Sequence, residues 1–249
     1  MQRTAWARDD GIHGLARAAE FPPLETARGR RGVVDPSQPS AEPFRGLRLA
    51  LELRRESRRG NVVVFTSANP GEGKSTIASN YAVVAALNQQ KVLLIDGDLR
   101  HPALHETFRV PRAPGVVDVL GGDPIATSTR RVRSLGHLEL LPAGRSIPGV
   151  GDLMSSKRMH EFVESASSNF DLVIIDTPPV LSVSDAASVA TRADADVVLI
   201  VDRKSRRRAV TRALRELDLV GANVVGIVLN HEGSLARYGY GYGYGYDGS

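Results

Sequence analysis

The sequence has no cysteine, one tryptophan, and no apolar run long enough for a membrane-spanning helix. Without cysteine the chain has neither disulfides nor thiol chemistry. A membrane-spanning helix needs roughly 20 consecutive apolar residues, and the first residues, MQRTAWARDDGIHGLARAAE, contain no apolar core of signal-peptide length. These absences predict a cytoplasmic protein.

Lysine is also scarce, and arginine supplies most of the positive charge. Lysine occurs only at positions 74, 91, 157 and 204, while the net charge is +4 and the pI is about 9.6. This mild basicity permits contact with an acidic membrane surface or nucleic acid but requires neither. The basic run over residues 203–208 has two interpretations: a solvated helix face, or a docking site for phosphorylated tails or lipid headgroups.

Tyrosine is nearly absent from the body of the chain, where only Tyr81 occurs, and is concentrated in the terminal sequence RYGYGYGYGYDGS. Alternating glycine disfavours a strand, so residues 233–249 are expected to form a flexible tail. Three interpretations are open for it: a low-complexity aromatic segment, a nucleic-acid stacking segment, or a set of phosphoryl acceptors. The acceptors would be Tyr238, Tyr240, Tyr242, Tyr244 and Tyr246.

Strand and helix patterns alternate between these ends. Continuous apolar runs, typical of buried parallel strands, occupy 61–67, 91–96, 138–143, 171–176, 196–201 and 223–229. Helical patterns occupy 42–55, 74–87, 115–121, 149–168, 183–192 and 205–219. The alternation predicts a three-layer α/β fold over residues 41–232 with a mostly parallel central sheet. Residues 1 to about 40 show no sustained apolar period and are expected to be largely disordered.

A phosphate-binding loop lies between the first predicted strand and the helix after it, where residues 67–76 read SANPGEGKST. Its glycines let backbone N–H groups turn toward an anion at the positive end of the helix. Lys74 is expected to reach the β- and γ-phosphates and Ser75 to ligate Mg²⁺. Ala68 stands where the strict pattern has glycine, so this is a deviant Walker A sequence. The nucleotide-binding residues are Asn69, Pro70, Gly71, Glu72, Gly73, Lys74, Ser75 and Thr76.

Two of the predicted strands end in acidic residues. One ends LLIDGDLR, which puts Asp96 and Asp98 on one face, and the other ends VIIDTPP, with Asp176 at its end. Ser75, Asp98 and Asp176 could surround one Mg²⁺, leaving Asp96 to accept a proton from an incoming hydroxyl. The alternatives are a solvated turn with Arg100 as counter-ion for the first strand end, and a carboxylate that accepts backbone N–H groups for the second.

Together these motifs resemble a known family. NPGEGKST, LLIDGDLR followed by HPALHETF, and VIIDTPPVLSVSD are similar to the bacterial tyrosine kinases of the P-loop type, the cytosolic kinase modules of capsular and exopolysaccharide synthesis. The resemblance runs from about Asp35 to Asn230, and the terminal tyrosine cluster is a further family feature. An E-x-x-R-x-x-R motif, which in the family builds a ring-shaped oligomer, is matched by Glu42, Arg45 and Arg48.

The resemblance implies a P-loop NTPase fold and an ATP- and Mg²⁺-dependent protein-tyrosine autokinase. One subunit's tail would enter a neighbour's site. Lys74, Asp96 and Asp98 would be catalytic, with Asp96 as the base, and Ser75, Asp98 and Asp176 would hold the metal. Gly46 lies inside the motif's helix and costs about 1 kcal/mol of helix stability relative to alanine.

The resemblance also implies partners. These are other copies of the chain in a ring, a separate membrane adaptor of the polysaccharide chain-length-determinant type, a cognate tyrosine phosphatase and sugar-metabolism enzymes as substrates. The adaptor would keep the protein at the inner face of the cell membrane, and no nucleic acid is expected.

Two other functions share the fold. A partition or cell-division ATPase, acting as a nucleotide switch, would carry a second lysine five residues before the phosphate-loop lysine, where this chain has Asn69. A catalytically silent scaffold would have no need of Lys74 and the three aspartates.

Overall fold

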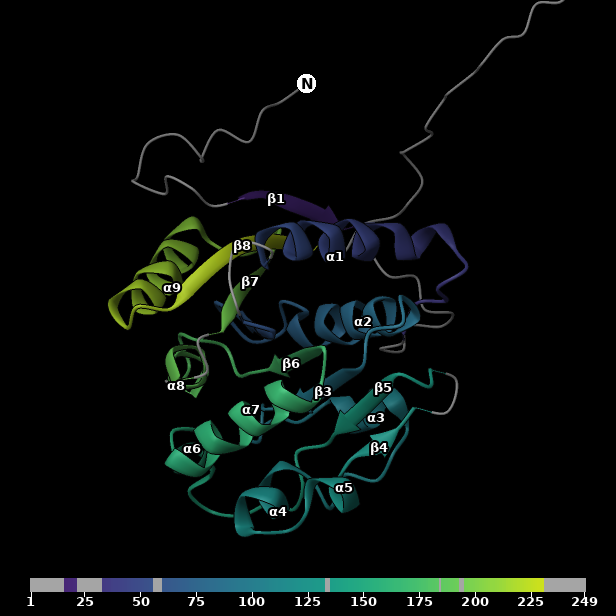
Figure 1. Cartoon of the computed structure of the whole chain (residues 1–249). Coiled ribbons are helices and arrows are strands. Elements are labelled where there is room, and N and C mark those ends of the chain that lie inside the picture. The colour runs from purple at the N-terminus through teal and green to yellow at the C-terminus, as the bar shows by residue number, and fades with distance from the viewer. Residues whose placement is uncertain are drawn as a thin grey trace, which may run out of the picture.

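The structure is a computed structural model that describes residues 16–21, 33–55, 60–132, 135–183, 185–192 and 195–230. Eight strands form one sheet in the order β1-β8-β7-β2-β6-β3-β5-β4 (Figure 1). All neighbours are parallel except β4 and β5. The strands are β1 (Ala16–Phe21), β2 (Val62–Ser67), β3 (Val92–Asp96), β4 (Arg130–Arg131), β5 (Leu138–Leu141), β6 (Leu172–Asp176), β7 (Asp196–Asp202) and β8 (Asn223–Asn230).

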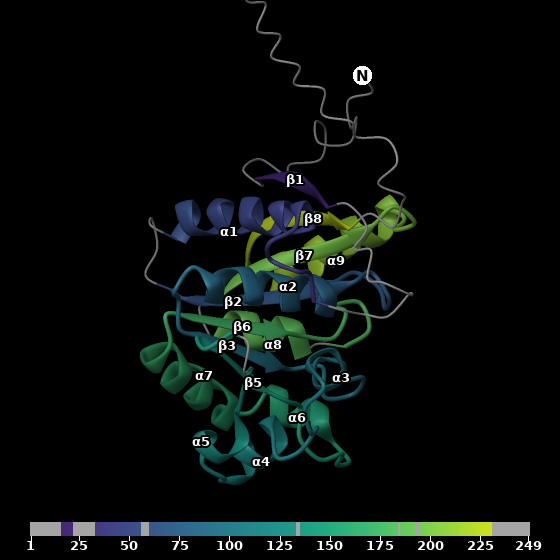
Figure 2. The same ribbon diagram turned by 90° about the vertical axis from the view of Figure 1, so that its right-hand side faces the viewer.

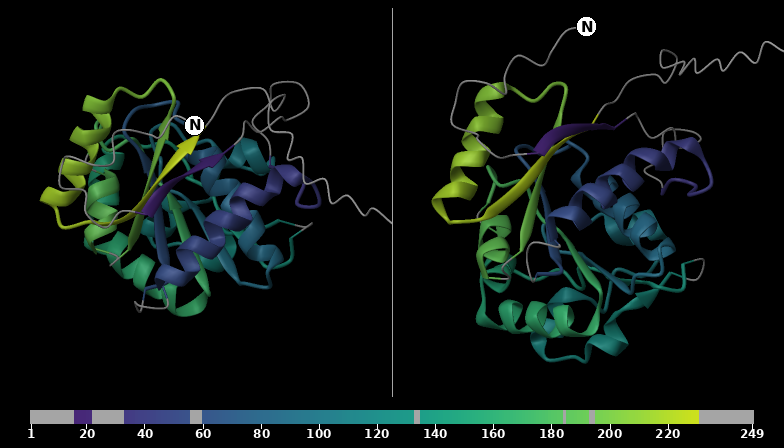
Figure 3. Two further views of the ribbon diagram at one scale, coloured as in Figure 1. Left: turned by 90° about the horizontal axis from the view of Figure 1, so that it is seen from above. Right: turned by 45° about the horizontal axis from the view of Figure 1, so that its top comes forward.

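Helices cover both faces of the sheet. In Figures 2 and 3, α1 and α2 lie on one side of it and α9 lies on the other. The expected three-layer α/β fold is confirmed. The helices are η1 (Pro39–Ala41), α1 (Glu42–Arg55), α2 (Lys74–Leu87), α3 (Leu104–Phe108), α4 (Val116–Gly121), α5 (Ile125–Ser128), α6 (Val150–Met154), α7 (Lys157–Asn169), α8 (Asp185–Arg192) and α9 (Arg207–Leu219).

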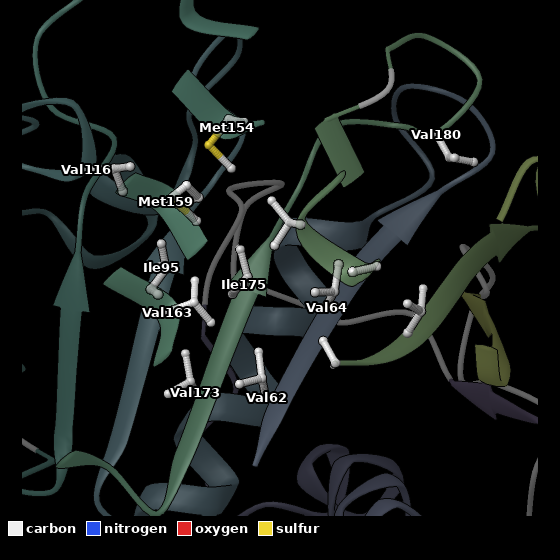
Figure 4. Close-up of a cluster of buried hydrophobic side chains, with 14 of the residues drawn as sticks. Val62, Val64, Ile95, Val116, Met154, Met159, Val163, Val173, Ile175 and Val180 are labelled. Carbon is white, nitrogen blue, oxygen red and sulfur yellow. The ribbon is translucent and has the colours of Figure 1, made fainter. Parts of the chain in front are cut away.

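The central strands are buried on both faces, which is why their sequences are continuous apolar runs. In β2, Val62 and Val64 pack into a cluster with α4, α6, α7, α8 and α9 (Figure 4). Val63 and Phe65 point the other way, into a cluster with α1 and α2. The alternation gives each face its own core and fixes the strand register, because a slip of one residue would exchange the two faces.

Most predicted elements form where the patterns place them, and α1 and α2 have the predicted bounds. The predicted helix 149–168 is instead two helices, α6 and α7. The break falls at Ser156, whose hydroxyl accepts the Met159 N–H at 3.2 Å and caps α7. The sequence did not predict the short elements α3, α5 and β4. It also did not predict β1, which lies within the segment expected to be largely disordered and pairs with β8.

Helix α1 belongs to the core despite Gly46 in its middle. Phe44, Leu47 and Leu51 form its buried stripe and lie in the same cluster as α2. The segment just before α1 is also anchored, because the Val34 N–H donates to Asn80 Oδ1 on α2 at 2.6 Å.

This packing predicts opposite outcomes for two leucines of α1. Leu47 is 5% exposed and Leu49 is 54% exposed. Leu47→Ala should lower the free energy of unfolding by about 2–4 kcal/mol, because it leaves a cavity against α2. Leu49→Ala should change it by less than about 0.5 kcal/mol. Urea unfolding of both variants measures the difference, and equal losses would show that α1 does not pack on its predicted face.

Candidate active site

The carboxyl ends of the parallel strands β2, β3, β6, β7 and β8 meet at one edge of the sheet. Asp96 ends β3 and Asp176 ends β6, and the two are register partners on neighbouring strands. Asp176 is also in register with Phe65 on the other side, in β2. The phosphate loop leaves β2 just beyond this point. The topology therefore brings the loop and both acidic strand ends together.

The phosphate loop depends on two glycines with left-handed backbone conformations. Gly71 has φ +83° and Gly73 has φ +90°, a region that side chains disfavour. Gly73 also lies against β8, since a Cβ there would be 2.1 Å from Asn230 Nδ2. α2 begins at Lys74, so the free N–H groups and positive dipole of a 14-residue helix face the site.

Lys74 contacts two of the three carboxylates. Its Nζ lies 2.8 Å from Asp98 Oδ2 and 3.7 Å from Asp176 Oδ1. The three side chains are only 11%, 4% and 0% exposed, respectively. Burial favours a lower pKa for Lys74, but the charges of Asp176 and Asp98 outweigh it and raise the pKa. The lysine is therefore the charged counter-ion of the cluster.

Asp96, at the end of β3, is fully buried. Its Oδ2 accepts the N–H groups of Ala103 and Leu104, at 3.2 and 3.0 Å, where α3 begins. Its Oδ1 has no hydrogen-bond partner within the described part of the chain. Burial, followed by the charge of Asp176, raises the pKa of Asp96 to about 8. A carboxyl group with such a pKa changes protonation near neutral pH, which suits a general base.

Asp176, like Asp96, has no exposed surface. Neither of its carboxylate oxygens has a hydrogen-bond partner among the described residues. Burial raises its pKa, and Lys74 opposes the shift. Gly97 packs directly against it, since a Cβ there would lie 2.8 Å from the Asp176 carbonyl oxygen. The charge of the Asp176 carboxylate is thus balanced mainly by Lys74 Nζ, which lies 3.7 Å from its Oδ1.

The geometry decides between the alternatives left open for the acidic residues. Asp98 is only 3% exposed and pairs with Lys74, so it is not a solvated turn residue. The side chain of Asp176 accepts no backbone N–H within the described ranges, so a turn-capping role does not explain it. The structure does bring Lys74, Ser75 and the three aspartates to one edge of the sheet, as the sequence predicts.

Other predicted positions lie elsewhere. Glu42, Arg45 and Arg48 are on α1, where Arg45 pairs with Glu42 at 2.6 Å and Arg48 pairs with Glu52. Each motif charge therefore already has a partner within its own helix. The tyrosines of the tail lie outside the described residues.

Glu72 of the phosphate loop makes three contacts that the sequence does not predict. The Ser205 hydroxyl, after β7, donates to Glu72 Oε1, and Asn230 Nδ2, at the end of β8, donates to the Glu72 carbonyl oxygen at 3.1 Å. Glu72 also accepts the Asn69 N–H at 2.9 Å. Asn230 is a polar residue that ends an apolar strand, the same signal that identified Asp176.

Across the described ranges, no three His, Cys, Asp or Glu side chains are arranged to hold a metal ion by themselves. No described helix has both the length and the apolar character needed to cross a membrane.

Comparison with known proteins identifies the family. The model of the ParA family, described as NUBPL iron-transfer P-loop NTPase, matches residues 58–238. The tyrosine-protein kinase YwqD of Bacillus subtilis is 35% identical over 207 residues, which cover 82% of this chain and 87% of YwqD. This chain belongs to the bacterial tyrosine kinases of the P-loop type. The expected family, fold and enzyme class are thereby confirmed.

Two further comparisons agree with this kinase assignment. The putative tyrosine-protein kinase EpsB of Ralstonia solanacearum is 36% identical over 203 residues, 78% of this kinase and 26% of EpsB. The kinase thus spans about a quarter of EpsB. The solved kinase domain of the Escherichia coli tyrosine kinase ETK superimposes with a TM-score of 0.79 at 30% identity. That match covers 92% of this kinase and 96% of the ETK domain.

The raised pKa of Asp96 predicts a pH-dependent stability. A carboxyl group whose pKa is about 8 when folded and 3.8 when unfolded stabilises the fold fully below about pH 4. This contribution is lost as the pH rises toward 8, by roughly 1 kcal/mol per pH unit while one proton is linked. Asp96→Asn should remove this slope from the nucleotide-free protein and make it more stable than wild type at pH 8.

Urea unfolding between pH 5 and 8 measures the slope, with Asp123→Asn as the control at an exposed aspartate. A wild-type profile that Asp96→Asn leaves unchanged would show that Asp96 titrates normally.

Proposed function

We propose that this kinase transfers the γ-phosphoryl group of ATP to its own C-terminal tyrosines, in trans within an oligomer, and so regulates capsular or exopolysaccharide synthesis and export. The observation that carries the proposal is the convergence of Lys74 with three buried aspartates beside a phosphate loop. A loop that only bound nucleotide would not need a buried carboxyl group with a pKa near 8.

ATP is assigned to the loop over residues 69–76. The N–H groups at the start of α2 face the phosphates, and Lys74 supplies a positive charge beside them. In the structure the Lys74 Nζ pairs with the carboxylates of Asp98 and Asp176. Binding of the phosphates would therefore draw Lys74 away from the carboxylates.

The donor set suits Mg²⁺. Asp176 and Asp98 both lie within reach of Lys74 Nζ, at 3.7 and 2.8 Å, and the Ser75 hydroxyl interacts with Asp176. Neither Asp176 carboxylate oxygen accepts a well-formed hydrogen bond from the described residues, so both can serve as ligands. Mg²⁺ prefers oxygen ligands and in such sites takes one or two carboxylates, with phosphates and water completing its shell. Ser75, Asp98 and Asp176 would hold it, and bound there it would neutralise charge on the phosphates.

Asp96 is assigned as the general base. The phenol oxygen of a tail tyrosine forms a bond to the γ-phosphorus while the bond from that phosphorus to the β,γ-bridging oxygen breaks, releasing ADP. The phenol proton passes to the carboxylate of Asp96. The N–H groups of Ala103 and Leu104 hold that carboxylate in place, and its other oxygen remains free to receive the proton.

The tail supplies the acceptors in this proposal. Each phosphate adds about 1.5 to 2 negative charges, so successive phosphorylation would load a ring of subunits with repelling anions and loosen it. Glu42, Arg45 and Arg48 are assigned to the ring contact, where they would exchange their present partners within α1 for partners in a neighbour. A membrane adaptor, a tyrosine phosphatase and sugar-metabolism enzymes are the proposed partners, and the adaptor would place the kinase at the inner face of the membrane.

The test is intact mass after incubation with ATP and Mg²⁺, with and without the cytosolic end of the adaptor, at several protein concentrations. Mass gains of one or more phosphates, mapped to Tyr238 through Tyr246 and absent from Lys74→Met, are expected. Transfer within an oligomer predicts that the rate per subunit falls on dilution.

Two outcomes would contradict the proposal. ATP hydrolysis without phosphate on the tail, adaptor included, would favour a nucleotide-switched ATPase of the partition type. Unchanged phosphotyrosine after Tyr→Phe replacement of all five tail tyrosines would refute the assignment of the tail.

A further inference from the structure

Glu72 is a negative charge inside a loop that binds a polyanion, and it is buried, with 4% of its surface exposed. A carboxylate in this position repels the phosphates that the loop receives, and burying it has a desolvation cost. Contact with the phosphates therefore does not account for a glutamate at this position. The hydrogen bonds that its carboxylate accepts do account for it.

The Glu72 carboxylate receives three hydrogen bonds from two segments of the chain. Asn69 donates its backbone N–H at 2.9 Å to Oε2 and its side-chain Nδ2 at 3.0 Å to Oε1. The hydroxyl of Ser205 also donates to Oε1. Hydrogen bonds to a carboxylate are roughly twice as strong as those between neutral groups. The two bonds from Asn69 connect two residues of the phosphate loop, and the bond from Ser205 connects the loop to the turn after β7.

The turn after β7 is itself held by hydrogen bonds among its own residues. The Ser205 hydroxyl accepts the Asp202 N–H at 2.9 Å, and Asp202 Oδ1 accepts the Lys204 N–H at 2.7 Å. Asp202 Oδ1 also lies 3.1 Å from the Ser205 hydroxyl, and the contact with Glu72 Oε1 is the shorter of the two, so the single hydroxyl proton is assigned to Glu72. On the other flank Asn230 donates to the Glu72 carbonyl oxygen and packs against Gly73. The phosphate loop is therefore fixed from β7 and from β8, and Glu72 takes part in both contacts.

We propose that Glu72 is a positioning residue, whose carboxylate, held by Asn69 and Ser205, fixes the phosphate loop against the turn after β7 in the shape that receives nucleotide. A loop already fixed in its binding shape loses less conformational entropy when the phosphates arrive. The inference rests on the proposed nucleotide binding. It adds that Ser205, distant in the sequence, helps to set nucleotide affinity without touching the phosphates.

The experiment is a double-mutant cycle on the affinity for a fluorescent ADP analogue with Mg²⁺, using the full chain. Glu72→Ala should weaken binding about tenfold and Ser205→Ala about threefold, values typical for the loss of charge-assisted hydrogen bonds. If Ser205 acts through Glu72, the double variant should bind no more weakly than Glu72→Ala alone. Independent roles would multiply the two effects to about thirtyfold.

Controls of the same residue types come from exposed positions of α7, where the Glu164 side chain pairs with His160 at 3.3 Å and the Ser168 hydroxyl donates to the backbone carbonyl of Glu164 at 3.1 Å. Glu164→Ala and Ser168→Ala should leave the affinity unchanged. Glu72→Gln keeps the size of the side chain and one acceptor oxygen, so it provides a variant that folds if Glu72→Ala does not, and its affinity should be intermediate. In the autophosphorylation assay the KM for ATP should rise while kcat changes by less than about twofold.

The results that would refute the positioning role differ from those that would refute the proposed function. If wild type binds the analogue and the Glu72 and Ser205 variants bind equally well, the positioning role is wrong, while the proposed kinase function is untouched. The same holds if the variants lose only thermal stability, or if their effects multiply. If wild type does not bind ADP with Mg²⁺, both the inference and the proposed function are overturned.

Discussion

The arrangement of the site depends on the ion pairs of one lysine, Lys74, whose side chain is only 11% exposed. A parallel sheet places the ends of β3 and β6 side by side, and both ends are aspartates in register. Two buried carboxylates on neighbouring strands repel each other, and Asp98 adds a third nearby. Lys74, at 2.8 Å from Asp98 and 3.7 Å from Asp176, supplies the opposing charge. Because burial strengthens both attraction and repulsion, removing one charge from such a cluster is far more costly than at the surface.

The rest of the fold serves to hold this arrangement rigid. β2, β6 and β3 are covered on both faces, so their carboxyl ends cannot shift relative to one another without disturbing two cores. Gly97 and Gly73 allow close approach of backbone to Asp176 and of Asn230 to the phosphate loop. A cluster of like charges that weakens the fold is retained where it is chemically useful, which is typical of functional sites. Repulsion among the carboxylates thus destabilises the site, and the packing of its strands on both faces holds it in place.

Much of this site could be predicted from the sequence, because its residues end apolar runs. Asp96 and Asp176 were found in that way, and a parallel sheet brings strand ends together whatever the strand order. The partners of each residue could not be predicted, because they depend on that order. The contact from Ser205 to Glu72 spans 133 residues and needs β7 to lie beside β2. The break between α6 and α7 was missed because one serine hydroxyl caps a helix inside a continuous amphipathic pattern.

The most direct test of this account is the free energy of unfolding of Lys74→Met in the absence of nucleotide and metal, compared with Lys157→Met. Lys157 pairs with Glu161 at the surface and is 85% exposed, so its loss should leave the free energy of unfolding nearly unchanged. Loss of Lys74 should lower stability by about 3–5 kcal/mol at pH 8, and by less at pH 5, where Asp96 and Asp176, whose pKa values are raised, can take up protons instead. If the two variants are equally stable at pH 8, Lys74 is not the counter-ion on which the carboxylate cluster depends.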